Sequence, residues 1–154
     1  MDESSLQERY APHNACFGCG PANPKGLRIR SFARDGEYVA TWNAEAHHEA
    51  FPGVLNGGIL GALLDCHMNW AAAHHLMVRA GGSTPPCTVT AEYAVQLRRP
   101  TPTRATVTVR ARIVESAEDR AIVESTLEAE AKVCALGRGT FVAVRPGHPA
   151  YHRW

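Results

Sequence analysis

One acidic residue in a strongly apolar stretch is the best candidate for chemistry. Asp65 is flanked by Leu63, Leu64, Cys66 and Met68. A buried carboxylate is costly unless it is paired, hydrogen-bonded or used, and burial raises its pKa towards the range of a general base. We therefore expect Asp65 to act as a catalytic base. The alternative is a carboxylate that reaches solvent or caps nearby backbone amides.

A second candidate group, Asn56-Gly57-Gly58, begins nine residues before Asp65. Asn is a preferred N-cap residue, and glycines let the backbone approach another molecule closely. The first amides of a helix have no partner within the helix, and the helix dipole attracts negative charge to that end. The pattern indicates a helix start that could form an oxyanion hole for acyl transfer. Ordinary helix capping is the alternative.

The spacing of these two groups constrains how they could cooperate. Gly57 and Asp65 are eight residues apart on one predicted helix, which corresponds to a rise of about 12 Å. A single acyl carbon cannot lie within about 3 Å of both residues. If both act on one substrate, they must come from different chains across a two-fold axis, so the spacing predicts a homodimer.

The elements that position these residues follow from hydrophobic periodicity. Residues 57–78 are apolar around most of the circumference of a helix, which predicts a helix wrapped by the rest of the protein. The strands are predicted from alternating polar and apolar residues; they span residues 26–32, 37–42, 88–97, 106–114, 120–131 and 133–144. We therefore expect an α+β protein with a curved antiparallel sheet around one long central helix.

The length and composition fit one domain. At 154 residues, we expect an N-terminal loop segment (1–25) packed on a single domain (26–145), followed by a detached tail (146–154). The formal net charge of +1 gives no reason to expect nucleic acid or an anionic membrane as partner. No apolar run approaches the roughly 18 residues of a membrane span, and the N-terminus lacks a signal segment. A cytoplasmic location is the resulting expectation.

Five cysteines, an odd number, argue against a disulfide framework. Cys16 and Cys19 have the two-residue gap of a zinc knuckle, but a structural zinc site usually takes four ligands and the sequence has no second such pair. His67 and His74 lie about 10 Å apart along the predicted helix, too far to share one ion. We therefore expect a packed turn at Cys16–Cys19, with no metal and no cofactor.

These residues resemble a known family. Asn56-Gly57-Gly58 followed by Asp65 resembles the His-Gly-Gly-x(6)-Asp/Glu signature of the hotdog-fold thioesterase superfamily, particularly its phenylacetyl-CoA thioesterase-like (PaaI-like) branch. Residues 16–27 are similar to an N-terminal motif of some of these proteins, and residues 88–100 resemble the family's long central strand and turn. The likeness covers about residues 16–145.

The resemblance implies a dimer of hotdog domains, often paired again into a homotetramer, that acts on acyl-CoA thioesters. Asp65 matches the family's general base or nucleophile, and Gly57 the glycine whose amide polarises the thioester carbonyl. Thr90 matches a position where some relatives place a residue that orients the water. Asn56 departs from the family's usual His; it can donate a hydrogen bond or cap the helix but cannot titrate.

Four further residues are candidates for substrate binding. Gly58 lies beside the predicted oxyanion hole, and His48 shortly precedes it. Arg99 and Arg138 suit the phosphates of CoA because a guanidinium donates bidentate hydrogen bonds. The alternative for these last three side chains is an ordinary charged surface.

Two other functions remain open at this stage. A hotdog enoyl-CoA hydratase would carry an Asp and a His in a different loop motif, which the sequence lacks. A non-catalytic acyl- or CoA-binding module would retain the fold without efficient chemistry, and Asn56 is the feature that favours it. The acyl group cannot be read from the sequence.

Overall fold

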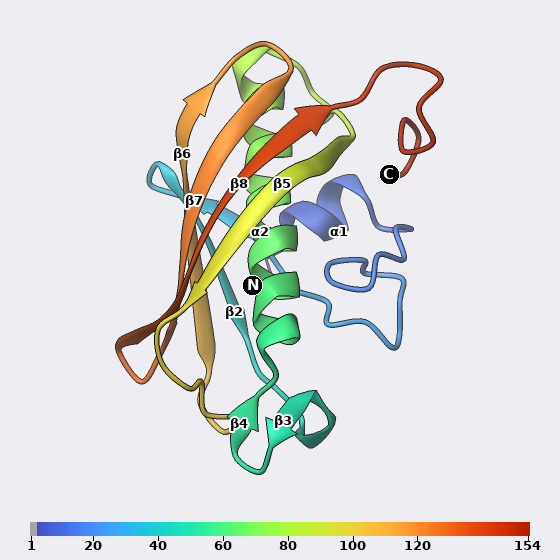
Figure 1. The fold of residues 1–154 in the computed structure, drawn as a ribbon. Coiled ribbons are helices and arrows are strands. Elements are labelled where there is room, and N and C mark those ends of the chain that lie inside the picture. The colour runs from blue at the N-terminus through green and yellow to red at the C-terminus, as the bar shows by residue number, and fades with distance from the viewer. Residues whose placement is uncertain (1–2) are drawn as a thin grey trace.

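Six antiparallel strands curve around one long helix in the structure, a computed structural model that describes residues 3–154 (Figure 1). The helix is α2 (Gly57–Arg79), and the strand order in the sheet is β1-β2-β6-β7-β8-β5. The strands are β1 (Phe32–Arg34), β2 (Glu37–Trp42), β5 (Thr88–Leu97), β6 (Val107–Ser116), β7 (Arg120–Ala129) and β8 (Lys132–Ala143). The predicted α+β architecture is confirmed.

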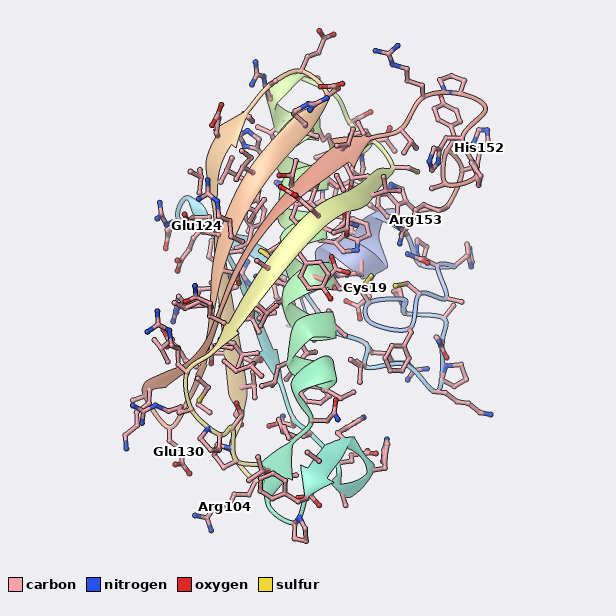
Figure 2. All side chains as sticks on the ribbon, in the orientation of Figure 1. Cys19, Arg104, Glu124, Glu130, His152 and Arg153 are labelled. Carbon is pink, nitrogen blue, oxygen red and sulfur yellow. The ribbon has the colours of Figure 1, made fainter. Side chains whose placement is uncertain are left out.

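Both sides of α2 are covered by protein. The sheet packs on one side, and the N-terminal segment with the short helix α1 (Leu6–Tyr10) lies on the other (Figure 1). Leu63, Leu64 and Trp70 are fully buried, as expected for a helix that is apolar nearly all round. The outer face of the sheet carries charged side chains such as Glu124 (Figure 2). Among residues 3–154, no helix is long and apolar enough to cross a membrane.

Three short elements precede α2. They are the 3-10 helix η1 (Ala46–His48) and a small hairpin of β3 (Glu49–Phe51) and β4 (Val54–Leu55). The backbone amide of Leu55 donates to the carbonyl of Thr101 (3.0 Å), so the loop after β5 fixes the end of this hairpin. The hairpin therefore sets where α2 begins.

The N-terminal segment is more ordered than a loop. Ser5 and Glu8 form a capping box at α1, with Ser5 Oγ accepting from the Glu8 amide (3.2 Å). The strand expected over residues 26–32 is reduced to β1, which begins at Phe32. Alternate residues there are buried as expected, but the amides of Leu27 and Ile29 donate to carbonyls of the preceding loop. The pattern therefore reports burial against the N-terminal segment.

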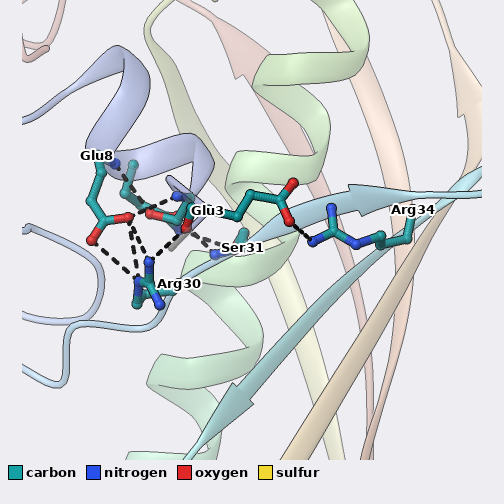
Figure 3. A network of polar contacts seen from close by, with 7 residues as sticks. Glu3, Glu8, Arg30, Ser31 and Arg34 are labelled. Atoms are coloured by element: carbon teal, nitrogen blue, oxygen red, sulfur yellow. Dashed lines mark hydrogen bonds and ion pairs between the residues drawn. The ribbon is translucent and has the colours of Figure 1, made fainter. Parts of the chain in front are cut away.

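Exposed ion pairs connect this segment to the β1–β2 hairpin (Figure 3). The Arg30 guanidinium donates to Glu8 Oε2 (3.0 Å) and to the carbonyl of Glu3 (2.9 Å). Arg34 forms a second pair with the Glu3 carboxylate at 2.5 Å. Exposed pairs of this kind contribute about 1 kcal/mol or less each, so they set register more than stability.

A buried polar network holds α1, α2 and β2 together. His67 Nε2 lies 3.0 Å from the carbonyl oxygen of Tyr38, which can only accept, so Nε2 carries the proton. His67 Nδ1 then accepts from the Ser31 hydroxyl (2.8 Å), and Ser31 Oγ accepts from Gln7 Nε2 (2.9 Å). Gln7, Ser31 and His67 are all buried, and every ring nitrogen of His67 is used. This arrangement requires a neutral imidazole.

The tail packs back onto the body, which differs from the detached segment expected over residues 146–154. The Trp154 ring lies 4.7 Å from the Trp70 ring, centroid to centroid, and its Nε1 donates to the carbonyl of Pro85 (3.2 Å). Arg153 Nη1 donates to the carbonyl of Thr88 (3.2 Å). An aromatic contact with a fully buried Trp70 makes the tail part of the folded unit.

The His67 network should make folding pH-dependent. Burial lowers the pKa of His67 from 6.5 to about 4. As the pH falls below 6.5, the unfolded chain takes up a proton that the folded chain refuses until about pH 4. The free energy of unfolding should therefore fall over this window, by up to about 3 kcal/mol. Urea unfolding at several pH values measures this slope. His67→Gln should flatten it, and an unchanged slope would contradict the assignment.

Candidate active site

A β-bulge in β5 determines which side chains face α2. Thr90 pairs with Phe141 of β8, whereas Glu92 pairs with Thr140. Two steps along β5 therefore correspond to one step along β8, and Ala91 is the extra residue. Because side chains alternate between the two faces of a strand, one inserted residue changes which positions face inward.

The bulge lets polar and apolar residues of β5 share the helix-facing side. Before it, Thr88 and Thr90 point towards α2 and bond to side chains of that helix. After it, Tyr93, Val95 and Leu97 face the same way: Val95 packs on the core, while Tyr93 and Leu97 lie over the small residues of the first helical turns. A strand without the bulge would send one of these two sets to the outer face.

Asp65 and Thr90 form the central pair of the site. Thr90 Oγ1 donates to Asp65 Oδ1 at 2.6 Å, a short bond to a partly buried carboxylate. Burial raises the pKa of Asp65, while the bond from Thr90 and the positive charge of Arg153 oppose that rise. Residues from α2, β5 and the tail therefore meet at one carboxylate. The pair fits the roles expected of Asp65 and Thr90.

The start of α2 leaves one amide free. Asn56 Oδ1 accepts from the amides of Gly58 (2.8 Å) and Ile59 (3.2 Å), and the Asn56 carbonyl also accepts from the amide of Leu60 (3.3 Å). The Gly57 amide has no acceptor among residues 3–154. Asn56 is thus the N-cap, and the unpartnered Gly57 N–H is the donor available to a developing oxyanion.

Exposed apolar side chains surround this helix start. A Cβ at Gly57 would lie 3.1 Å from Leu97 Cδ1, so this glycine allows Leu97 to approach. Leu97 is 58% exposed, Phe51 is 59% exposed and Tyr93 is 46% exposed. Large apolar side chains gathered in this way mark a surface that binds another molecule.

His48 and Arg99 occupy different positions relative to the site. The carbonyl of His48 accepts from the Asn56 amide (3.0 Å), so His48 adjoins the helix start. Its Nδ1 accepts from the Glu45 amide (2.9 Å), which occupies one side of the ring. Arg99 is exposed beyond the end of β5, where its backbone amide donates to Cys134 (3.2 Å). His48 can therefore reach a substrate at Gly57 without moving, whereas Arg99 extends into solvent.

Arg138 lies on the face of the sheet opposite Asp65. A Cβ at the neighbouring Gly137 would touch Met68 of α2, so residue 138 points outward. There Arg138 pairs with Glu124, which also pairs with Arg112 (2.6 Å). These side chains line a hollow of about 530 Å³ on the outer face. Within one chain, the structure therefore does not bring Arg138 to Asp65.

Two contributors to the site were missed in the sequence. Arg153 acts electrostatically on Asp65 although 88 residues separate them, and nothing in the tail signals this contact. Cys66 lies beside Cys16, with the two sulfurs 3.9 Å apart. Only the position of Cys66 next to Asp65 could have drawn attention to it.

Solved structures show what this fold resembles, although no family model and no curated protein matches the sequence. A thioesterase superfamily protein from Shewanella loihica PV-4 is 26% identical with a TM-score of 0.65, over 76% of this chain and 91% of that one. The PaaI protein of the Escherichia coli phenylacetic acid degradation operon is 20% identical with a TM-score of 0.63, over 77% and 81%. An uncharacterised Pyrococcus horikoshii protein is 16% identical with a TM-score of 0.66, over 86% and 95%.

The chain therefore has the hotdog fold, and these relatives support a function of the hotdog thioesterase kind. Its resemblance to the PaaI-like branch, carried in the sequence by residues 56–65, is borne out by these solved structures.

The capping role of Asn56 can be tested separately from any activity. Asn56→Ala should lower the free energy of unfolding by about 1 kcal/mol, because two helix amides lose their acceptor. Asn56→Asp keeps a carboxylate oxygen in the same place and should retain most of the stability. Chemical denaturation of the three proteins measures the difference. Equal stability of the Ala and Asp variants would show that the cap is unimportant.

Proposed function

We propose that the protein is an acyl-CoA thioesterase in which Asp65 activates the attacking water. The observation that carries this proposal is the Asp65–Thr90 pair, a partly buried carboxylate held in one orientation by a 2.6 Å hydrogen bond. The free Gly57 amide provides the second requirement of acyl transfer, a donor for the carbonyl oxygen. The likeness to thioesterase superfamily structures supports the same reaction class.

The reaction needs only water and these groups. Asp65 takes a proton from a water molecule while the water oxygen bonds to the thioester carbon, and the Gly57 amide stabilises the negative oxygen of the tetrahedral intermediate. When the intermediate collapses, the carbon–sulfur bond breaks. The proton on Asp65 passes to the departing thiolate, which leaves a carboxylic acid and the free thiol. Thr90 keeps the carboxylate aimed and can accept a hydrogen bond from the same water.

This mechanism requires two chains. Asp65 is about 12 Å along α2 from Gly57, and the contacts of β5 repeat this separation: Thr90 binds Asp65, and Leu97 lies on Gly57. An antiparallel pair of β5 strands centred between Tyr93 and Ala94 would place Thr90 of one chain opposite Leu97 of the other. Asp65 of one chain would then lie near Gly57 of its partner.

The edge position of β5 supports this dimer. The strand is ten residues long, contains no proline and hydrogen-bonds only to β8 in the described chain. A long, unprotected edge strand is a template for pairing with another chain. Pairing would also cover Tyr93 and Leu97, which are otherwise exposed. We propose the homodimer as the active unit, with a homotetramer as a further assembly.

Substrate contacts follow from the same arrangement. Gly58 and His48 adjoin the proposed oxyanion hole and would line the acyl or pantetheine path. Arg99 is exposed near the end of β5 and would reach the phosphates of CoA bound at the dimer edge. Arg138 would contribute only from the outer face, through the hollow that it shares with Glu124.

Asp65→Asn should reduce acyl-CoA hydrolysis on the order of 10²–10⁴-fold, since the amide cannot take a proton. Thr90→Val should reduce it about tenfold by freeing the carboxylate, whereas Thr90→Ser keeps the hydroxyl and most of the rate. Free-thiol release from a panel of acyl-CoAs measures all three, and circular dichroism checks folding. Full activity in folded Asp65→Asn would remove the mechanism. Acyl-CoA binding without hydrolysis in the unaltered protein would indicate the binding module instead.

Mixing two inactive variants tests the shared site. Gly57→Pro removes the proposed oxyanion donor at the first helical position, which tolerates proline. Combined with Asp65→Asn, unfolded and refolded together in equal amounts, half of the dimers should be mixed and each should hold one intact site. Activity should therefore return to about a quarter of the unaltered level. No recovery from folded mixed dimers would place both residues of each site in one chain.

A further inference from the structure

Three cysteines that are distant in sequence converge beside α2. Cys16 and Cys19 belong to the N-terminal segment and Cys66 to α2, and their three sulfur atoms all lie within 4.8 Å of one another. Figure 2 shows Cys19 between the helix and the N-terminal loop. The Cys16–Cys19 pair, judged incomplete from the sequence, thus gains a third sulfur from the helix. His13 is exposed and outside this cluster.

The sulfur spacing matches a metal site better than a disulfide. Tetrahedral zinc binds thiolates at about 2.3 Å, which separates two sulfur ligands by about 3.8 Å. Cys16 Sγ and Cys66 Sγ are 3.9 Å apart. A disulfide would need about 2.05 Å. The trio therefore sits at the corners of a face that one ion could cap without rearrangement.

The backbone around the trio is shaped for close approach of sulfur. A Cβ at Gly18 would lie 2.3 Å from Cys66 Sγ, so any other residue there would displace the Cys66 thiol. Gly18 lies inside the Cys16–Cys19 turn, and that turn is closed by a bond from the Gly20 amide to the Cys16 carbonyl (2.9 Å). The turn and the helix thus fit together only with glycine at this position.

Polar groups around the trio favour thiolates. The amides of Gly18 and Cys19 act on the Cys16 sulfur, although hydrogen bonds from the Cys19 and Cys66 thiols are the largest cause of its lowered pKa. The indole of Trp70, which is fully buried, also favours the thiolate form of Cys19. Its Nε1 has no hydrogen-bond partner among the described residues. An unpartnered buried donor beside a sulfur is accounted for once that sulfur carries negative charge.

We propose that Cys16, Cys19 and Cys66 form a zinc site that fastens the N-terminal segment to α2. The three thiolates bind one Zn²⁺, and a water molecule takes the fourth position, which the half-buried Cys16 and Cys66 leave accessible. With one thiolate and two thiols in the metal-free trio, binding releases two protons. This site is independent of the proposed thioesterase reaction, since its ligands are neither Asp65 nor Gly57.

Metal titration of the full chain tests the proposal. Chelator-treated protein should bind about one Zn²⁺ per chain, and Co²⁺ in its place should give the thiolate-to-cobalt charge-transfer absorption of a sulfur-rich tetrahedral site. Zinc should also protect three of the five cysteines from alkylation and raise the midpoint of thermal unfolding. Mass spectrometry of the alkylated protein identifies the protected residues.

Variants separate this trio from the other thiols. Cys66→Ser should abolish the cobalt absorption and the zinc-dependent thermal shift, whereas Cys134→Ser and Cys87→Ser should retain both. If Cys66→Ser does not fold, the spectrum and alkylation pattern of the unaltered protein still decide. The proposal is overturned if the unaltered protein gives no thiolate–cobalt absorption. It is equally overturned if protein kept under reducing conditions holds a Cys16–Cys66 disulfide.

Discussion

The burial of α2 is the constraint on which the rest of the molecule depends. A helix that is apolar nearly all round must be covered on every side, and a curved sheet covers only one. The N-terminal segment covers the other side, held by the Gln7–Ser31–His67 network and by the ion pairs of Arg30 and Arg34. Residues that precede the sheet are therefore as necessary to the core as the strands.

The same burial decides what polar residues on α2 can do. His67 must remain neutral and spends both nitrogens on fixed partners, so it serves the fold alone. Asp65 is less enclosed and has one strong partner, Thr90, which leaves capacity for a substrate or water. Cys66 faces the N-terminal segment rather than the sheet. Three adjacent positions on one helix thus meet three different environments.

Periodic patterns were sufficient to predict the large elements. The apolar run from residue 57 gives α2 nearly to its end, and β5 was predicted with its observed bounds, because both signals arise from local burial. Over residues 26–31 alternation predicted a strand, yet the backbone there bonds to an irregular loop. Alternation reports which side chains are buried, not which backbone groups they accompany. The Cys66 and Arg153 contacts depend on tertiary packing, for which a single sequence holds no local signal.

The bulge at Ala91 divides β5 into two parts that can change independently. Positions before it supply the hydroxyl for Asp65, and positions after it supply the apolar cover of the helix start. Substitutions at Tyr93 or Leu97 can reshape the space for a substrate without moving Thr90. Loss of Ala91 alone, although it removes one small exposed residue, would put the two parts out of phase. The strand is thus permissive to exchange of side chains and intolerant of a change in length.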